Sequence, residues 1–196
     1  MTSKTGIANM ALQLLGQPPT LVNVDTDNTQ RAQDIRTVYD AALDAALADH
    51  PWKFALVRAT WAAKDTAPTW GYANAYEFAT DPLCLDVYRL SPDHHGDEPL
   101  WDRVGNEIHT DEGGPLYVEY ISRVTDTARY HPMFVLYLAA KIAAWCAYKI
   151  TGKSDKADEL NAQARDLARD ARWKSAVATG RKLPKEGDFL SSRGVP

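Results

Sequence analysis

Residues 133–150, with the sequence MFVLYLAAKIAAWCAYKI, decide the fold of this chain. Apolar side chains surround the segment on nearly every side, which is typical of a helix buried at the centre of a core. Lys141 lies at its middle, where a charge is costly in a membrane-spanning helix. Pro132 precedes it and suits the first turn of a helix. We therefore expect a buried core helix here.

The segment that follows predicts a second, amphipathic helix. Residues 151–154 form a short turn, and helical spacing resumes over about 155–178. Its apolar stripe comprises Leu160, Ala164, Leu167, Ala168 and Ala171. The other face alternates charge and carries Arg165, Asp166, Arg169, Asp170 and Arg172. This pattern is typical of a solvated helix face, and a subunit interface is the alternative that we retain.

Two helices are predicted before residue 51. Apolar residues recur at helical spacing over 7–15, and Gly16 is a natural end for that helix. Residues 27–30, DNTQ, resemble the capping box that begins a helix. The helix beginning there should end before Pro51, because proline disfavours helix in the residue that precedes it.

Residues 52–125 lack helical periodicity and predict β-structure. The segments 54–58 and 84–90 are strand-like, and in the second we expect Leu85, Val87 and Arg89 to share one face. Strand-like residues 107–110 and 116–121 flank the loop 111–115, which contains two glycines. This arrangement predicts a β-hairpin.

These elements together predict an α+β fold that is mainly α. About four helices form a bundle, and a small antiparallel β-lobe is inserted at about residues 52–125. We expect one domain over 1–180, with its helical core in 3–50 and 131–178. An extended C-terminal arm over 181–196 follows.

The composition excludes several classes of protein. The chain has 196 residues, of which 45% are hydrophobic and 24% charged, as in globular proteins. Its formal net charge of −4 gives no overall electrostatic attraction for nucleic acid or an anionic membrane. The two cysteines, Cys84 and Cys146, have no metal-ligand spacing and are expected to be buried thiols.

Residue patterns typical of catalysis are weak, and we predict no enzyme activity, cofactor or metal. The densest group of ligand-type side chains is His94 and His95 with Asp93, Asp97 and Glu98. A solvated acidic loop explains that group better than a metal site does, because histidines at helical spacing and a distant ligand are both missing. His50 and His131 each precede a proline, where a hydrogen bond at a helix end is expected.

The C-terminal arm carries the remaining candidate site. Its apolar pair, Phe189 and Leu190, is flanked by four basic residues, which are Arg181, Lys182, Lys185 and Arg193. Such a segment can become ordered when it binds a partner. A solvated tail that contacts nothing is the alternative.

Several segments in order resemble one protein family. They are ALQLLG (11–16), DHPWKFA (49–55) with Arg58 and Ala59, FATDPLCL (78–85), GGPL (113–116), YISRVTD (120–126) and PMF (132–134). Over roughly residues 5–172 the chain is similar to the head-to-tail adaptors of tailed bacteriophages, of the tail tubular protein A type. The combined order of the segments carries this resemblance, and each segment alone is weak.

The resemblance implies a structural virion protein. Family members form a ring, typically a dodecamer, that docks on the portal protein of the filled head. The ring extends the DNA channel, so that genomic DNA passes without specific binding, and offers an attachment surface for a downstream tail or nozzle protein. It further implies the head–tail junction of the virion as the location, with host cytoplasm during assembly, and no membrane. The arm after residue 180 is expected to dock on the portal.

Two alternatives follow from the residues themselves. The first is a non-viral α-helical scaffold or interaction module with a β-insert. The second is a small metal-dependent hydrolase that uses the loop of His94 and His95. The scaffold predicts a monomer or dimer with a soluble partner, and the hydrolase predicts an activity that is lost when both histidines are replaced by alanine.

Overall fold

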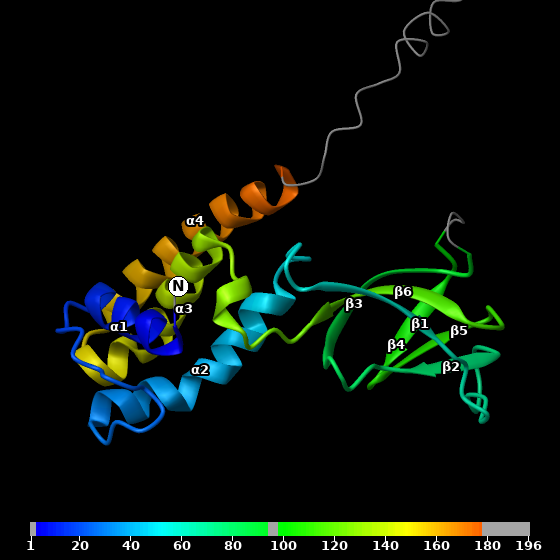
Figure 1. The fold of residues 1–196 in the computed structure, drawn as a ribbon, viewed down its shortest axis with the longest axis horizontal. Helices are drawn as coiled ribbons and strands as arrows, with labels where there is room; N and C mark the ends of the chain where they lie inside the picture. The colour runs from blue at the N-terminus through cyan, green and yellow to red at the C-terminus, as the bar shows by residue number, and fades with distance from the viewer. Residues whose placement is uncertain (1–2, 94–97, 178–196) are drawn as a thin grey trace, which may run out of the picture.

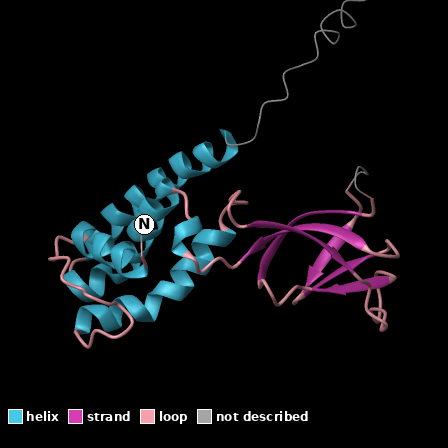
Figure 2. Cartoon of the chain, in the orientation of Figure 1, coloured by secondary structure: helices cyan, strands magenta, loops and turns pink. Residues whose placement is uncertain are grey.

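The computed structural model describes residues 3–93 and 98–177 of the chain. These residues form two lobes that lie side by side, one helical and one made of strands (Figure 1). The helices come from both ends of the described chain, and the strands come from its middle (Figure 2). The fold is therefore α+β and mainly α, as the sequence predicts.

Helix α3 (Pro132–Thr151) is the centre of the helical lobe. It contacts α1 (Lys4–Leu14), α2 (Gln30–Ala48) and α4 (Ser154–Val177). The imidazole Nδ1 of His131 caps the start of α3 by accepting a hydrogen bond from the Met133 amide at 3.2 Å. By length and composition alone α3 could cross a membrane, but 61% of its most apolar window is buried inside the protein. It is the core helix that its sequence predicts.

The start of α2 differs from the predicted capping box. Thr29, and not Asp27, is the N-cap, and its hydroxyl accepts a hydrogen bond from the Ala32 amide. The Asp27 carboxylate accepts instead from the amide of Thr29 at 2.8 Å. The side chain of Asp27 thus fixes the turn before the helix, and the helix begins two residues later than the pattern predicted.

The β-lobe is a sandwich of two three-stranded antiparallel sheets. Strands β1 (Leu56–Trp61), β6 (Leu116–Ser122) and β3 (Cys84–Ser91) form one sheet in that order. Strands β2 (Asn74–Glu77), β5 (Glu107–Thr110) and β4 (Trp101–Val104) form the other. A shared core that includes Trp61 and Val118 from one sheet and Tyr76 and Ile108 from the other holds them together.

The predicted hairpin between residues 107–110 and 116–121 is wrong. Strand β5 pairs with β4 and β2, whereas β6 pairs with β1 and β3, so the loop 111–115 crosses from one sheet to the other. The actual hairpin joins β4 to β5 through Gly105 and Asn106, where Gly105 has a positive φ of 62°. The glycines of loop 111–115 predicted a turn, but the turn connects strands that belong to two different sheets.

The shared face predicted for residues 84–90 is also wrong. The pairing of β3 with β6 shifts its register between Cys84 and Asp86 and again between Val87 and Arg89. Such irregularities interrupt the alternation of side chains along a strand. As a result Val87 and Leu90 enter the sandwich core, Leu85 packs against the helical core, and Arg89 is exposed.

The two lobes meet where the chain leaves and re-enters the helical core. Ala55, Ile121 and Val124 belong to the helical core cluster although they flank the strands. The amide and the hydroxyl of Ser122 both donate to the Ala55 carbonyl at 2.8 Å. Arg123 reaches back to Asp44 (2.5 Å) and Asp40 (3.3 Å) on α2. The β-lobe is thus an insertion whose two ends lie together.

Candidate interaction surfaces

The charged face of α4 is exposed, as the sequence predicts. Arg165, Asp166, Arg169 and Asp170 are exposed, and Asp166 pairs with Arg169 at 3.1 Å. Arg172 is half-buried and pairs within the subunit, with Asp49 at the end of α2. Four of the five residues predicted at the interface are therefore exposed, whereas Arg172 joins α4 to α2 within the subunit.

A groove runs between α3 and α4 beside this face. Its volume is about 310 Å³, and its lining includes Asp49, Tyr137, Lys141, Trp145 and Arg165. Ala164 and Ala168 of α4 also line it, and their small side chains leave room between the two helices. We call it the Lys141 groove. The sequence gave no sign of it, because its residues come from three separate helical segments.

A hydrogen-bonded network crosses the Lys141 groove. The Lys141 ammonium donates to the Tyr137 hydroxyl at 3.1 Å, and that hydroxyl donates to the Asp49 carboxylate, also at 3.1 Å. The Arg172 guanidinium binds the same carboxylate oxygen. Burial lowers the pKa of Lys141, while the nearby Asp49 carboxylate opposes that shift. The groove lining contains three basic side chains, Lys141, Arg165 and Arg172, and one acidic side chain, Asp49, so its net charge is positive.

Large aromatic side chains are exposed on the same pair of helices. Trp145 is 45% exposed and lies beside Lys141, whose ammonium is 5.9 Å from its ring centroid. Tyr148 is 69% exposed and Trp173 is 60% exposed. Tryptophan and arginine are enriched among the residues that dominate protein interfaces. The α3–α4 pair therefore has the composition of a contact surface.

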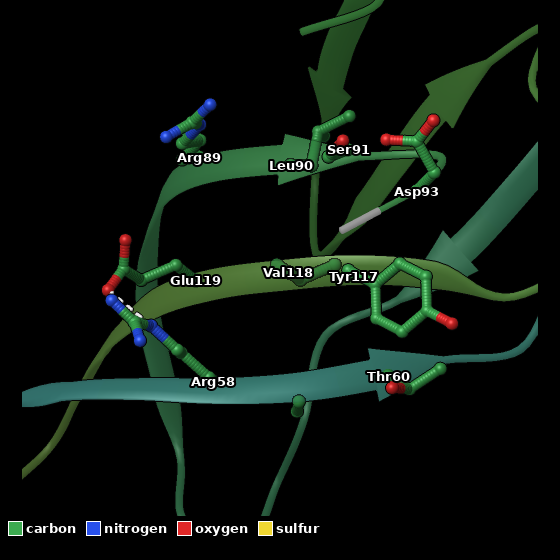
Figure 3. A pocket seen from close by; sticks show the side chains of 10 residues that line it. Arg58, Thr60, Arg89, Leu90, Ser91, Asp93, Tyr117, Val118 and Glu119 are labelled. Atoms are coloured by element: carbon green, nitrogen blue, oxygen red, sulfur yellow. Dashed lines mark hydrogen bonds and ion pairs between the residues drawn. The ribbon is translucent and has the colours of Figure 1, made fainter. Parts of the chain in front are cut away.

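A second polar surface lies on the outer face of the sheet β1–β6–β3 (Figure 3). Glu119 on the central strand is opposite both Arg58 and Arg89 on the neighbouring strands, and it pairs with Arg58 at 3.1 Å. Thr60 and Tyr117 are the next opposed pair along the same face. These side chains line a shallow, open depression that suits a polar contact.

The far tip of the β-lobe carries a third surface. The loop between β1 and β2 lines a depression of about 470 Å³ with Pro68, Trp70 and Tyr72. Trp70 is 86% exposed, whereas Trp61, Tyr76 and Phe78 are buried in the sandwich core. The aromatic side chains of this region are thus divided between packing inside the β-lobe and an exposed position at Trp70.

Among the described residues, no group of three or more His, Cys, Asp or Glu side chains is arranged to hold a metal ion. Both cysteines are buried, as predicted, and burial raises the pKa of the Cys84 thiol to about 12 and that of Cys146 to about 11. Thiols in that state are poor nucleophiles. His109 lies in a row with Glu107 and Lys64 whose side chains pair with one another.

Two of the sequence predictions lie outside the described residues. They are the loop of His94 and His95 and the C-terminal arm, with Arg181, Lys182, Lys185, Phe189, Leu190 and Arg193. Both remain predictions from sequence. Of the loop's acidic neighbours, Asp93 and Glu98 are described. Asp93 lines the depression on the sheet β1–β6–β3, and Glu98 accepts a hydrogen bond from the Trp101 indole at 3.1 Å.

Comparison with known proteins assigns no family. No family model matches the chain, and no curated protein matches it. Function must therefore be argued from the surfaces described above together with the sequence resemblance.

Proposed function

We propose that the chain is a head-to-tail adaptor of a tailed bacteriophage, a structural subunit of a ring that docks on the portal. The ring would extend the DNA channel and provide the attachment surface for the tail. The sequence segments that resemble this family support the proposal, and the fold of helices with a β-insert is the one that the resemblance implies.

The observation that carries the proposal is the exposure of large aromatic side chains on the α3–α4 pair. Trp145, Tyr148 and Trp173 remain exposed on the helical lobe, and Trp145 lines the groove together with Lys141 and Arg165. Leaving such apolar area in water is unfavourable, and tryptophan and tyrosine are enriched at protein interfaces. A ring subunit needs lateral surfaces of this kind, because each copy contacts two neighbours.

The β-lobe suits a second role in the same assembly. It projects from the helical lobe (Figure 1) and carries the polar depression on its outer sheet (Figure 3). Trp70, in its loop between β1 and β2, is exposed. In this proposal the helices build the ring and the strands face a different component. Each lobe would then make one of the two contacts of an adaptor.

The test is assembly with the cognate portal protein. Full-length chain is mixed with purified portal and imaged by electron microscopy, with the portal alone as the control. We expect additional rotationally symmetric density on one face of the portal. If the mixture shows the portal alone and the chain stays a monomer or dimer that captures a soluble partner instead, the scaffold interpretation replaces the adaptor.

A further inference from the structure

We propose that the Lys141 groove is the receptor for acidic side chains of α4 from a second copy of this chain. The contact is heterologous, with the groove of one copy against the acidic flank of α4 in the next. This inference rests on the proposed function, because it assigns residues to the lateral contact of the ring.

The two arginines of α4 that line the groove lie on a different flank from three of its acidic residues. Asp158 lies on the side of the arginines, and Arg169 pairs with Asp166. At 100° per residue, Arg165 and Arg172 are two turns apart and lie on the same side of the helix, toward the groove that both line. Asp166 and Asp170 are one turn apart and lie about 100–140° further round. Glu159 belongs to this second flank, which we call the acidic flank. Each copy thus presents both signs of charge on one helix.

The groove has donors that the subunit itself leaves unused. The Arg172 Nε is buried and has no hydrogen-bond partner among the described residues. Lys141 donates to the Tyr137 hydroxyl, and an ammonium has three donors. A buried donor without a partner is costly, and a carboxylate is the acceptor that a guanidinium binds best. An incoming aspartate or glutamate would meet the accessible donors of the same groove, on Lys141 and Arg165.

Aromatic side chains on both surfaces support the same pairing. Trp145 lines the groove, and Trp173 lies on the acidic flank near Asp166 and Asp170 in the helical rotation. Both are exposed in the single subunit. Apolar area at the centre of a contact, with charge pairs around it, is the usual composition of a specific interface.

A second copy is the occupant that the charges favour. When two copies make one such contact, with the groove of one against the acidic flank of the other, the pairing is heterologous, and a heterologous contact closes into a ring when its rotation allows. Groove against groove would instead bring Lys141, Arg165 and Arg172 of two copies together. Like charges in that arrangement oppose association.

The first experiment reverses charges and measures ring assembly on the portal as a function of chain concentration. We expect Arg165→Glu, and separately Asp170→Arg, to raise the half-maximal concentration about tenfold or more. In the double variant the half-maximal concentration should return to within about threefold of the natural value, because the charge pair is restored with its signs exchanged. Lys153→Glu, a reversal on the exposed turn before α4, is the matched control and should have no effect.

The second experiment does not need the portal. One batch carries Asn161→Cys beside the groove, another carries Gln163→Cys on the acidic flank, and a tag distinguishes them by size. The natural cysteines are buried, so a short thiol–thiol cross-linker should react with the new ones. We expect dimers that join the two variants, and few dimers of either variant alone.

The outcomes separate this inference from the proposed function. Rings that form on the portal at natural concentrations with Arg165→Glu would overturn the groove contact and leave the adaptor standing. Cross-linked dimers of Asn161→Cys alone, or none of the mixed type, would overturn it as well. Mixed dimers without any assembly on the portal would support the contact and count against the adaptor.

Discussion

Asp34 is the most deeply buried carboxylate among the described residues. Its side chain is 5% exposed, and it accepts hydrogen bonds from Lys149 at 2.7 Å and Gln30 at 2.8 Å. Burial alone would raise the pKa of Asp34, but these two partners outweigh it and hold the pKa below the ordinary value of 3.8. One ion pair therefore ties α2 to the end of α3.

We predict that Lys149→Met lowers the free energy of unfolding by about 1–3 kcal/mol at pH 7, because it leaves a buried charged acceptor with one partner fewer. A group whose folded pKa is depressed contributes stability above its unfolded pKa and loses it as pH falls through the folded value. Because burial raises the pKa of Asp34 once Lys149 is gone, the difference from the natural chain should be full near neutral pH and shrink as the pH falls through the acidic range. Urea denaturation at several pH values measures this.

Lys153→Met is the matched control for that prediction. Lys153 is an exposed lysine on the neighbouring turn, and no ion pair of its side chain occurs within residues 3–93 and 98–177. It should change stability by less than about 0.5 kcal/mol at any pH. Equal losses for both lysines, or a loss at Lys149 that grows on acidification, would contradict the role of Asp34.

Leu138 provides a direct test of the core helix. It is fully buried, whereas Leu136 on the same helix is 43% exposed. Leu138→Asp places an unpaired carboxylate in the core at a cost of several kcal/mol, comparable with a whole stability of about 5–15 kcal/mol. We expect thermal unfolding and circular dichroism to show an unfolded or aggregated protein for Leu138→Asp and a native one for Leu136→Asp. Cooperative unfolding of Leu138→Asp near the natural temperature would refute its placement.

At the scale of elements, the sequence predicted the helices better than the strands. The apolar pattern of residues 133–150 and the stops at Gly16 and Pro51 are local signals, and α1, α2 and α3 follow them closely. Strand pairing is not local. The bulges of β3 and the crossing after Thr110 depend on how two sheets close around Tyr76 and Ile108, which no spacing within one strand records.

The Lys141 groove could not be predicted from the sequence, for a similar reason. Arg165 and Arg172 were recognised as members of a charged face, but Asp49, Tyr137 and Lys141 lie far away along the chain. Only the packing of α4 on α3, over Ala164 and Ala168, brings the five together. Small residues at helical spacing signal close packing, yet they do not say which polar neighbours will flank it.

The polar contact between the two lobes, made by Arg123, is the one whose loss is easiest to measure. Arg123, 26% exposed, bonds to both Asp40 and Asp44 of α2. We predict that Arg123→Ala lowers the free energy of unfolding by about 1–2 kcal/mol, since it removes charge-assisted hydrogen bonds. The control is Arg58→Ala, whose side chain is 85% exposed and pairs with a single carboxylate.

Arg58→Ala should cost less than about 0.5 kcal/mol, as exposed ion pairs contribute little. Hydrogen exchange near Ser122 and Ala55 should quicken in the Arg123 variant alone. Unchanged exchange there, together with unchanged stability, would mean that the apolar contacts of Ile121 and Val124 hold the joint unaided.

At the scale of the whole molecule, the net charge predicts how strongly the protein binds DNA. The net charge of −4 supplies no general attraction for phosphates. We predict weak duplex binding without sequence preference, measured by fluorescence anisotropy at physiological salt. Specific complexes typically have dissociation constants of about 10⁻⁸–10⁻¹¹ M. A sub-micromolar complex with one sequence would move the protein to the DNA-recognition class.

The C-terminal arm gives the second prediction at this scale. Truncation after Gly180 removes Arg181, Lys182, Lys185 and the pair Phe189 and Leu190, all beyond the end of α4. We expect the thermal unfolding midpoint to stay nearly unchanged and docking on the portal to weaken, as measured by co-sedimentation. Unaltered docking would remove the arm from the mechanism. A large loss of stability would mean instead that it packs on its own subunit.

The closeness of the two ends of the β-lobe has a consequence for modularity. Because Ser122 bonds directly to Ala55, a linker of a few residues could bridge them and leave the helical cluster of α1–α4 continuous. The sandwich has its own core around Trp61 and Leu116, so it is a structural unit with packing of its own. One helical frame can in this way carry different lobes, so that the surface of the β-lobe changes while the packing of α1–α4 stays fixed.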